Sequence, residues 1–531
     1  MVPPELISTA IDIASIVSWL ECGGQKDSAV TPKKMASSSN IRENYDGAVN
    51  LKLYHHKLDD WAIEIIDNID QELGKKILQP DGTEVEDTRM TRQIFTLGEL
   101  AQICPHRINK RLFLIMQSII FQQGIKRKRK DLPSSQTQSN DPIQINFKPT
   151  TKLQALSVIT LAKMCLQNED MAKTVVPAFG HLLDTTKDPA LKNNIMYALS
   201  DMCVRYASLV DPLMPQMTAC LKDLSLVVRR TTLTTLIHLL QEDYIKMTSG
   251  IFFRILQTLC DEYDEIKDLT TFYIQQRLLK RKPKTMYNNF VESLFNFNGY
   301  EGHESYNKNK AFLNDRDKAL FNLSGKKYRD DRMKLYKFML EHMSDEYRFQ
   351  TTHKLCQDVL NGCVEGSVKL NAPNAHELLQ DTLACLASEE IKLASLKSKS
   401  DVDQEIDPNA ETTPENMAGA VLAAAKKTII SQVVKKNVIE NIIPIVIALK
   451  HRLEKLKSPL LDDLMTYLRE LMKDYKNEVK EILAADKQLA TEIQFDLKKW
   501  EEEMEARKAR EEEEVISLDF AIKLNFKNHF I

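Results

Sequence analysis

Glycine and aromatic residues are scarce in this sequence of 531 residues, which has 15 glycines and an aromatic content of 7%. Strand-rich folds need many turn residues, so this scarcity argues against them. The hydrophobic content of 43% and the charged content of 28% are typical of a soluble protein rich in Leu, Lys and Glu. A mostly helical fold is therefore expected.

The sequence also lacks paired cysteines and long apolar runs. Its nine cysteines are scattered without a CxxC pair, which argues against a disulfide framework or a zinc module and favours reduced thiols in a cytosolic or nuclear protein. The longest late apolar run, 442–449, is about half the roughly 20 residues of a membrane-spanning helix. No basic start precedes the N-terminal apolar residues. We predict neither a membrane span nor a signal peptide.

Motifs of enzymes are absent as well. The sequence contains no phosphate-binding loop, dinucleotide-binding glycine motif, HExxH zinc motif or GxSxG elbow. We therefore expect a protein that is not an enzyme and needs no cofactor. His55 and His56 are adjacent, so they are better interpreted as a surface pair than as metal ligands. Cys356 and Cys363 are better interpreted as core residues.

An internal repeat is the most informative feature that is present. A basic residue opens a stretch of helical apolar spacing at Lys152, Lys192, Arg229 and Lys267, at intervals of 40, 37 and 38 residues. A second apolar stretch and a turn signal follow within each unit, which indicates two helices per repeat. An earlier unit is expected near Arg92. Stacked helix pairs of this period predict an all-α fold, a HEAT or armadillo-like alpha-solenoid with a long charged C-terminal helix.

Composition along the chain predicts six segments. They are an N-terminal helical segment with the first HEAT-like helices (1–124), a polar basic insertion (125–150), the HEAT-repeat solenoid (151–394), a flexible linker (395–417), C-terminal helical pairs (418–497), and a charged helix and tail (498–531). The apolar helices within 433–475 are expected to finish the solenoid core, and a groove for a partner's helix is the alternative. The stretch 498–514 is interpreted as a solvated helix.

The formal net charge is only −3, so any claim of nucleic-acid binding must rest on local patches. One patch is a run of five cations in the polar insertion: Lys126, Arg127, Lys128, Arg129 and Lys130. This run is a candidate nuclear import signal. Direct phosphate contact and a merely solvated charge run are the alternatives.

A second patch extends over residues 277–337, where 15 Lys and Arg face 7 Asp and Glu. Its candidate DNA-phosphate contacts are Lys280, Arg281, Lys282, Lys284, Lys326, Lys327, Arg329, Arg332 and Lys334. The alternative for the first four is stabilisation of a helix end before Pro283. The interleaved Tyr287, Tyr328 and Tyr336 are expected to pack between repeats rather than to stack on bases.

Several long, irregular stretches resemble the larger non-SMC HEAT-repeat subunit of condensin II, the D type, between about residues 90 and 500. They include NNIMYALSDMCVRYASLVDPLMPQMTACLKD, FNFNGYEGHESYNK, LSGKKYRDDRMKLYKFMLEHMSDEYRF and VIENIIPIVIALKHRLEKLKSPLLDDLMTYLRELMKDY. Members of this family are longer than this chain. Their usual Ser/Thr/Pro-rich tail is replaced here by VISLDFAIKLNFKNHFI.

This resemblance implies a non-catalytic regulatory scaffold that takes part in mitotic chromosome condensation. The implied partners are the kleisin subunit, the SMC ATPase pair and the other HEAT subunit of condensin II, with DNA or nucleosomes engaged through basic surface and no membrane. The implied location is the nucleus, on chromosomes. The DNA-contact residues are inferred from charge and are not carried over from the family. The alternative hypothesis is a HEAT-type transport or adaptor protein that binds peptide segments without touching nucleic acid.

Overall fold

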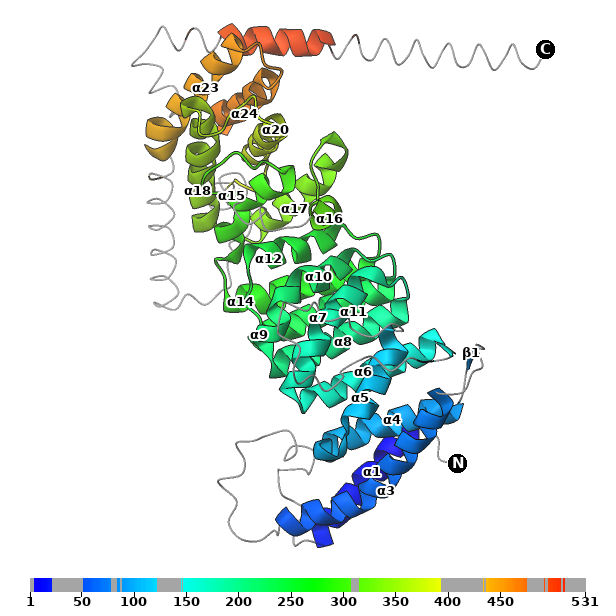
Figure 1. The fold of residues 1–531 in the computed structure, drawn as a ribbon. Helices are drawn as coiled ribbons and strands as arrows, with labels where there is room; N and C mark the ends of the chain where they lie inside the picture. The colour runs from blue at the N-terminus through cyan, green and yellow to red at the C-terminus, as the bar shows by residue number, and fades with distance from the viewer. Residues whose placement is uncertain are drawn as a thin grey trace, which may run out of the picture. The chain divides into compact units, whose positions relative to one another are not determined.

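A computed structural model describes residues 4–21, 51–77, 84–85, 88–121, 147–306, 315–392, 436–474 and 495–507, with residues 145, 433, 491 and 510 besides. The described part is almost entirely helical, as predicted (Figure 1). Its exception is a parallel pair of two-residue strands, β1 (Glu84–Val85) and β2 (Lys148–Pro149). Among the described helices, none combines the length and apolar character that a membrane span needs.

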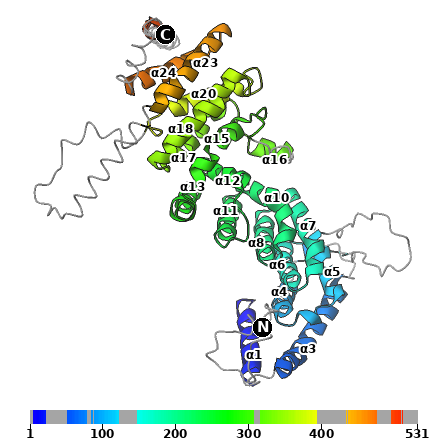
Figure 2. The same ribbon diagram turned by 90° about the vertical axis from the view of Figure 1, so that its left-hand side faces the viewer.

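The chain forms two compact units, residues 1–270 and 271–531. The helices of the first unit are α1 (Pro4–Glu21), α3 (Leu51–Ile77), α4 (Thr88–Ile103), α5 (Lys110–Phe121), α6 (Thr151–Leu166), α7 (Glu169–Thr185), α8 (Pro189–Arg205), α9 (Ala207–Val210), α10 (Met214–Ala219), α11 (Leu226–Gln241), α12 (Ser249–Leu256) and α13 (Asp264–Tyr273), whose last residues enter the second unit. Helices α4, α6, α8 and α11 pack side by side in one layer, and α5, α7 and α10 form a second (Figure 2). This is the helix-pair stacking that the repeat predicts.

Local sequence explains where the helices of the first unit begin. The side chains of Thr150, Asn168 and Asp188 accept hydrogen bonds from backbone N–H groups three residues on, at 3.3, 3.1 and 2.7 Å. Each cap satisfies a donor that the first helical turn leaves unpaired. The predicted apolar stripes are buried in the core: Ile195, Leu199, Met202, Leu233, Leu236 and Leu240.

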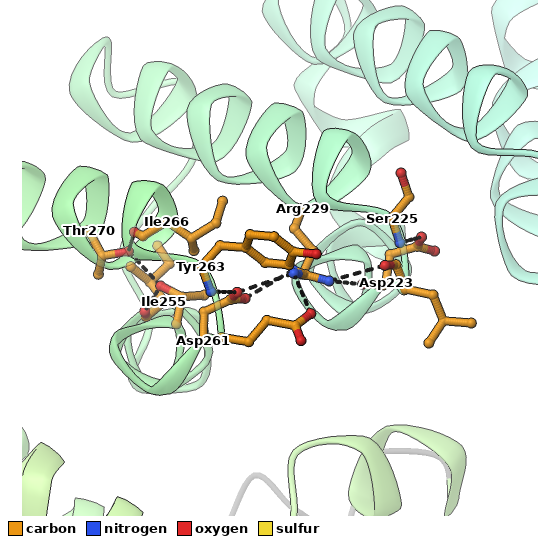
Figure 3. A network of polar contacts seen from close by, with 11 residues as sticks. Asp223, Ser225, Arg229, Ile255, Asp261, Tyr263, Ile266 and Thr270 are labelled. Atoms are coloured by element: carbon orange, nitrogen blue, oxygen red, sulfur yellow. Dashed lines mark hydrogen bonds and ion pairs between the residues drawn. The ribbon is translucent and has the colours of Figure 1, made fainter.

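The periodic cations that open two of the repeats connect each repeat to the next. Lys192 of α8 forms an ion pair with Asp223, in the turn before α11. Arg229 of α11 is buried, and its Nε lies 3.0 Å from Oδ2 of Asp261, in the turn before α13 (Figure 3). Its Nη1 also donates to the carbonyl of Asp223 at 2.7 Å. These cations are therefore structural, whereas Lys267 pairs within its own helix with Asp264, at 2.6 Å.

The second unit contains further short helices. They are α14 (Leu279–Arg281), α15 (Thr285–Asn298), α16 (Asp315–Leu320), α17 (Arg329–Glu341), α18 (Asp345–Lys354), α19 (Gly362–Glu365), α20 (Ala375–Leu386), α23 (Ile443–Lys455) and α24 (Leu461–Asp474). In the described part of this unit, π-helical segments interrupt them at Ile274–Leu278, Leu355–Asn361 and Val438–Ile442. Helix α24 packs on α20 and α23, and its residues Leu464 and Leu468 are buried, as expected of a helix that finishes a core.

The described residues 495–507 are helical and contact α23 and α24. Asp496 lies 2.7 Å from Lys450, and the Trp500 ring N–H donates to Asp462 at 3.0 Å. This part of the predicted charged helix is thus not solvated on every side. Apart from residue 510, the rest of that helix and the tail lie outside the described residues, as do the predicted linker 395–417 and the predicted import signal 126–130.

Candidate nucleic-acid interface

Four of the predicted phosphate contacts form one exposed cluster, which extends from α14 to the residue before α15. This turn cluster consists of Lys280, Arg281, Lys282 and Lys284, and all four side chains are exposed. Helix α14 ends at Arg281, the Lys282 backbone leaves helical geometry, and Pro283 follows. The cations therefore lie at a helix end, as predicted, where positive charge is favourable next to the terminal carbonyls.

The turn cluster rests on a helix that the second unit holds firmly. Ile274 and Leu278 of the π-helical segment are buried. The Gln275 amide lies 2.8 Å from Nε2 of His342, whose Nδ1 lies 2.7 Å from the carbonyl of Phe338. Because a carbonyl can only accept, His342 donates from Nδ1 and accepts from Gln275 at Nε2. The exposed cations thus extend from a fixed base.

The aromatic residues next to the turn cluster are engaged in packing. Tyr287, in the first turn of α15, stacks on Tyr347 of α18 with ring centroids 5.4 Å apart. The Lys354 ammonium lies 4.3 Å from the centroid of the Tyr287 ring. Tyr336 is fully buried, and the Lys327 ammonium lies over Tyr328 at 5.3 Å. These contacts support the packing interpretation over base stacking.

Sequence reasoning did not identify Lys354 as part of this surface. A usable signal existed, because Lys354 follows Tyr347 by seven residues and so lies on the same helical face two turns later. The contact with Tyr287 needed the structure, since it joins α15 to α18.

A second group of predicted contacts lies around the start of α17. Lys326, Lys327 and Lys334 are exposed. Arg329 is half-buried and lies close to Asp463 of α24. Burial raises the pKa of that carboxyl, and the charge of Arg329 and a hydrogen bond from Gln380 act in the opposite direction. Arg329 is therefore less available to a phosphate than its three exposed neighbours.

Arg332 was predicted to contact phosphate, and its surroundings contradict that prediction. The side chain is 1% exposed. Its Nε donates to Oδ2 of Asp381 at 2.6 Å, and Nη2 donates to Oδ1 at 3.3 Å. Nη1 donates to the carbonyls of Leu323 and Gly325, at 2.7 Å each. A guanidinium so enclosed cannot reach a ligand in solvent.

The turn cluster and the pair Lys326 and Lys327 lie at opposite ends of α15. Lys284 directly precedes the first residue of this helix, whereas Asn322 and Ser324, just before Lys326, lie beside Gly299 at its other end. Fourteen helical residues span about 20 Å at 1.5 Å per residue. The length of α15 therefore separates the turn cluster from Lys326 and Lys327, and it corresponds to roughly six nucleotide steps along one DNA strand.

The other sequence-predicted features behave as core. Cys356 and Cys363 are almost completely buried, and burial raises the pKa of each thiol to about 12. Within the described residues, no group of three or more His, Cys, Asp or Glu side chains is placed to hold a metal ion. His55 and His56 fall within α3.

Family models match most of the chain. Two models described as HEAT repeats of condensin-2 complex subunit D3-like proteins match residues 86–183 and 389–511. A model described as non-SMC mitotic condensation complex subunit 1 matches residues 190–369. These matches support the HEAT-repeat solenoid and the expectation that the chain is not an enzyme.

Curated proteins are similar over most of this chain. Condensin-2 complex subunit D3 of Mus musculus is 40% identical over 84% of this chain and 29% of its own length. Condensin-2 complex subunit D3-L of Xenopus laevis is 40% identical over 86% of this chain and 30% of its own length. Condensin-2 complex subunit CAP-D3 of Arabidopsis thaliana is 30% identical over 93% of this chain and 35% of its own length. The chain spans about a third of the length of these relatives.

One solved structure, titled Kap95:Nup1 complex, aligns with 92% of this chain and 66% of its own chain at 12% identity. Its TM-score is 0.23, which is too low to favour a transport function.

Proposed function

The chain is a homologue of condensin-2 complex subunit D3, and from this premise we propose that it is a non-catalytic scaffold of condensin II. In this role it takes part in mitotic chromosome condensation in the nucleus. It associates with the kleisin subunit, the SMC ATPase pair and the other HEAT subunit, and it contacts DNA or nucleosomes through its basic surface. ATP hydrolysis belongs to the SMC pair.

The observation that carries the DNA part of the proposal is the turn cluster. Four cations project from five consecutive residues, all exposed, on a base fixed by buried π-helical residues and the Gln275–His342 hydrogen bond. Lysine and arginine side chains that neutralise phosphates release condensed counterions, which makes binding favourable and dependent on salt. The exposed Lys326 and Lys327 add a second contact point at the other end of α15, and the exposed Lys334 lies in α17.

In this proposal the surface contacts the DNA backbone and not the base edges. The aromatic rings of Tyr287 and Tyr347, beside the turn cluster, stack on each other, and Lys354 covers the ring of Tyr287. Seven phosphate contacts would give a slope of log K against log salt of about −6. We therefore expect weak sequence preference and a steep loss of affinity with salt.

Titration of the full chain with duplex DNA at increasing salt tests this proposal. We expect reversal of the turn cluster, in K280E/R281E/K282E/K284E, to weaken binding at low salt more than tenfold and to reduce the slope by about 3 to 4. A matched variant, K110E/K187E/K246E/K369E, reverses four exposed lysines elsewhere and changes the net charge equally. Equal weakening in both variants would contradict a localised site, and absence of binding even at low salt would exclude DNA contact by this chain.

The same variant separates the scaffold proposal from the adaptor alternative in cells. A condensin scaffold that contacts DNA through the turn cluster should lose chromosome association when the cluster is reversed, while its protein partners remain bound. A peptide-binding adaptor should keep its chromosome association and lose a protein partner instead. Imaging of tagged variants on mitotic chromosomes, together with recovery of bound subunits, measures both outcomes.

A further inference from the structure

Arg332 lies at the centre of a buried polar network that joins three helices. The carboxylate of Asp381 in α20 accepts two hydrogen bonds from the Arg332 guanidinium, and its Oδ2 accepts a third from the Asn298 amide of α15 at 3.0 Å. The Asn298 amide also donates to the hydroxyl of Tyr336, at 3.3 Å. All four side chains are at most 1% exposed. The guanidinium is thereby held in one orientation.

The third nitrogen of this guanidinium, Nη1, is directed at the chain just before α17. Nη1 donates to the carbonyls of both Leu323 and Gly325. Gly325 has φ of +94° and ψ of +163°, a backbone conformation that side-chain-bearing residues rarely adopt. Ser324 N–H is bonded to the Asn322 side chain at 2.9 Å. The backbone of 322–325 is thus fixed by side-chain bonds at several points.

Two exposed lysines follow this fixed backbone at once. Lys326 and Lys327 open a one-turn 3₁₀ helix directly after Gly325, and Tyr328 N–H returns to the Gly325 carbonyl at 3.3 Å. The same Gly325 oxygen therefore accepts from Arg332 and from the turn that carries both lysines. The direction in which these lysines leave the surface depends on where Arg332 holds that oxygen.

We propose that Arg332 is a positioning residue for DNA-backbone binding, which orients Lys326 and Lys327 through the Leu323 and Gly325 carbonyls. This inference rests on the proposed function, because it takes these lysines as phosphate contacts. Arg332 itself does not touch the ligand. Its role explains why a buried ion pair stands here, since such pairs contribute little net stability compared with apolar side chains but fix geometry well.

A double-mutant cycle tests this role with the full chain. R332M/D381L replaces both buried charges with apolar groups and leaves no unpaired ion, so the fold is expected to survive. K326A/K327A removes the two contacts. We expect each variant to weaken duplex binding at low salt by roughly tenfold and to reduce the salt slope by about two. The combined variant should bind no more weakly than either alone, because both changes remove the same contacts.

Amide hydrogen exchange provides a readout that does not depend on DNA. We expect exchange of residues 322–328 to accelerate in R332M/D381L, while the helices of the first unit stay protected as in the wild type. Should R332M/D381L fail to fold, R332K serves in its place. The lysine ammonium can keep the ion pair with Asp381 but cannot donate to both carbonyls as the guanidinium does. We therefore expect R332K to lose DNA affinity to an intermediate degree.

Three results would overturn the inference, and they differ in what else they imply. In the first, R332M/D381L binds DNA with wild-type affinity and salt slope, while K326A/K327A binds more weakly. This result would show that the lysines contact DNA and that Arg332 does not position them. In the second, amide hydrogen exchange of residues 322–328 is unchanged in R332M/D381L, which would also exclude the positioning role of Arg332. Wild-type binding by K326A/K327A would show that these lysines are not contacts, and the inference would then fail together with that part of the proposed function.

Discussion

Arg229 and Arg230 are neighbours in α11 with very different surroundings. Arg229 is buried and contacts Asp261, Glu262 and two backbone carbonyls. Arg230 is 59% exposed and pairs with Glu265 alone, at 2.8 Å. Removing one partner of a buried ion pair leaves an uncompensated charge, whereas an exposed pair in water contributes little.

We therefore predict that Arg229→Met lowers the free energy of unfolding by about 3 kcal/mol. The matched Arg230→Met should lower it by less than about 1 kcal/mol. Urea unfolding followed by circular dichroism measures both. Comparable losses in the two variants would show that the connection between repeats does not depend on the buried arginine.

The buried thiols of the second unit predict a loss of stability at alkaline pH. Burial raises the pKa of Cys356 and of Cys363 to about 12 in the folded chain, against an ordinary value of 9.0. Above pH 9 the unfolded chain releases these protons and the folded chain keeps them, so rising pH favours unfolding. Between pH 8 and pH 10 we expect a loss of about 1.4 kcal/mol per thiol.

Urea unfolding at pH 8 and pH 10 checks this expectation, with C356A/C363A as the control. The double variant starts less stable, but its loss between the two pH values should be smaller by roughly 3 kcal/mol. An identical pH dependence in wild type and variant would assign the alkaline loss to other groups.

At the residue scale, sequence identifies cations but not their burial. Lys326 and Arg332 belong to one basic stretch, and both were predicted to contact phosphate. The structure separates them because Asp381, which lies 49 positions after Arg332, accepts the arginine in the core. Nothing local marks that pairing, since it depends on how α17 and α20 pack. The exposed turn cluster was predictable, because Pro283 ends the helix whatever surrounds it.

Helix α15 shows how an element ends. Gly299 follows it with φ of +69°, and Tyr300 N–H reaches back to the Phe295 carbonyl at 3.0 Å. This is the hydrogen bond of a left-handed helix cap, which favours glycine. A Cβ at this position would lie 3.2 Å from the Asn374 amide nitrogen.

We predict that Gly299→Ala lowers the free energy of unfolding by about 1–2 kcal/mol, because alanine is disfavoured at positive φ. Gly250, in the first turn of α12, has ordinary φ, and its nearest neighbour would be 3.9 Å from a new Cβ. Gly250→Ala should be neutral or stabilise by up to about 1 kcal/mol. Thermal unfolding of both variants checks the contrast, and a loss of equal size at the two sites would refute the cap explanation.

At the scale of elements, the regular helices were predictable and the connections were not. The stripes of α8 and α11 follow from apolar spacing within a single helix, which needs no knowledge of partners. The π-helical segment Ile274–Leu278 contacts a distant residue, since Gln275 bonds to His342. The backbone at 322–325 is fixed by Arg332, which Asp381 holds from 49 positions away. The short pairing of β1 with β2 joins segments more than 60 residues apart and left no pattern in either.

At the scale of the whole molecule, a formal net charge of −3 coexists with a strongly basic stretch at 277–337. Part of its positive charge is neutralised inside the fold, as at Arg332, and the exposed part includes the turn cluster and the pair Lys326 and Lys327. Binding to DNA would therefore arise from local surface rather than from net charge. The homology to condensin-2 complex subunit D3 provides the context in which such a surface is useful.

Affinity purification of the tagged full chain from mitotic cells, with identification of the co-purifying proteins, tests the scaffold proposal most directly. We predict that the kleisin subunit and the SMC ATPase pair of condensin II are recovered with the chain, and that they are also recovered with the K280E/R281E/K282E/K284E variant. Recovery of peptide-transport partners without any condensin subunit would contradict the proposal.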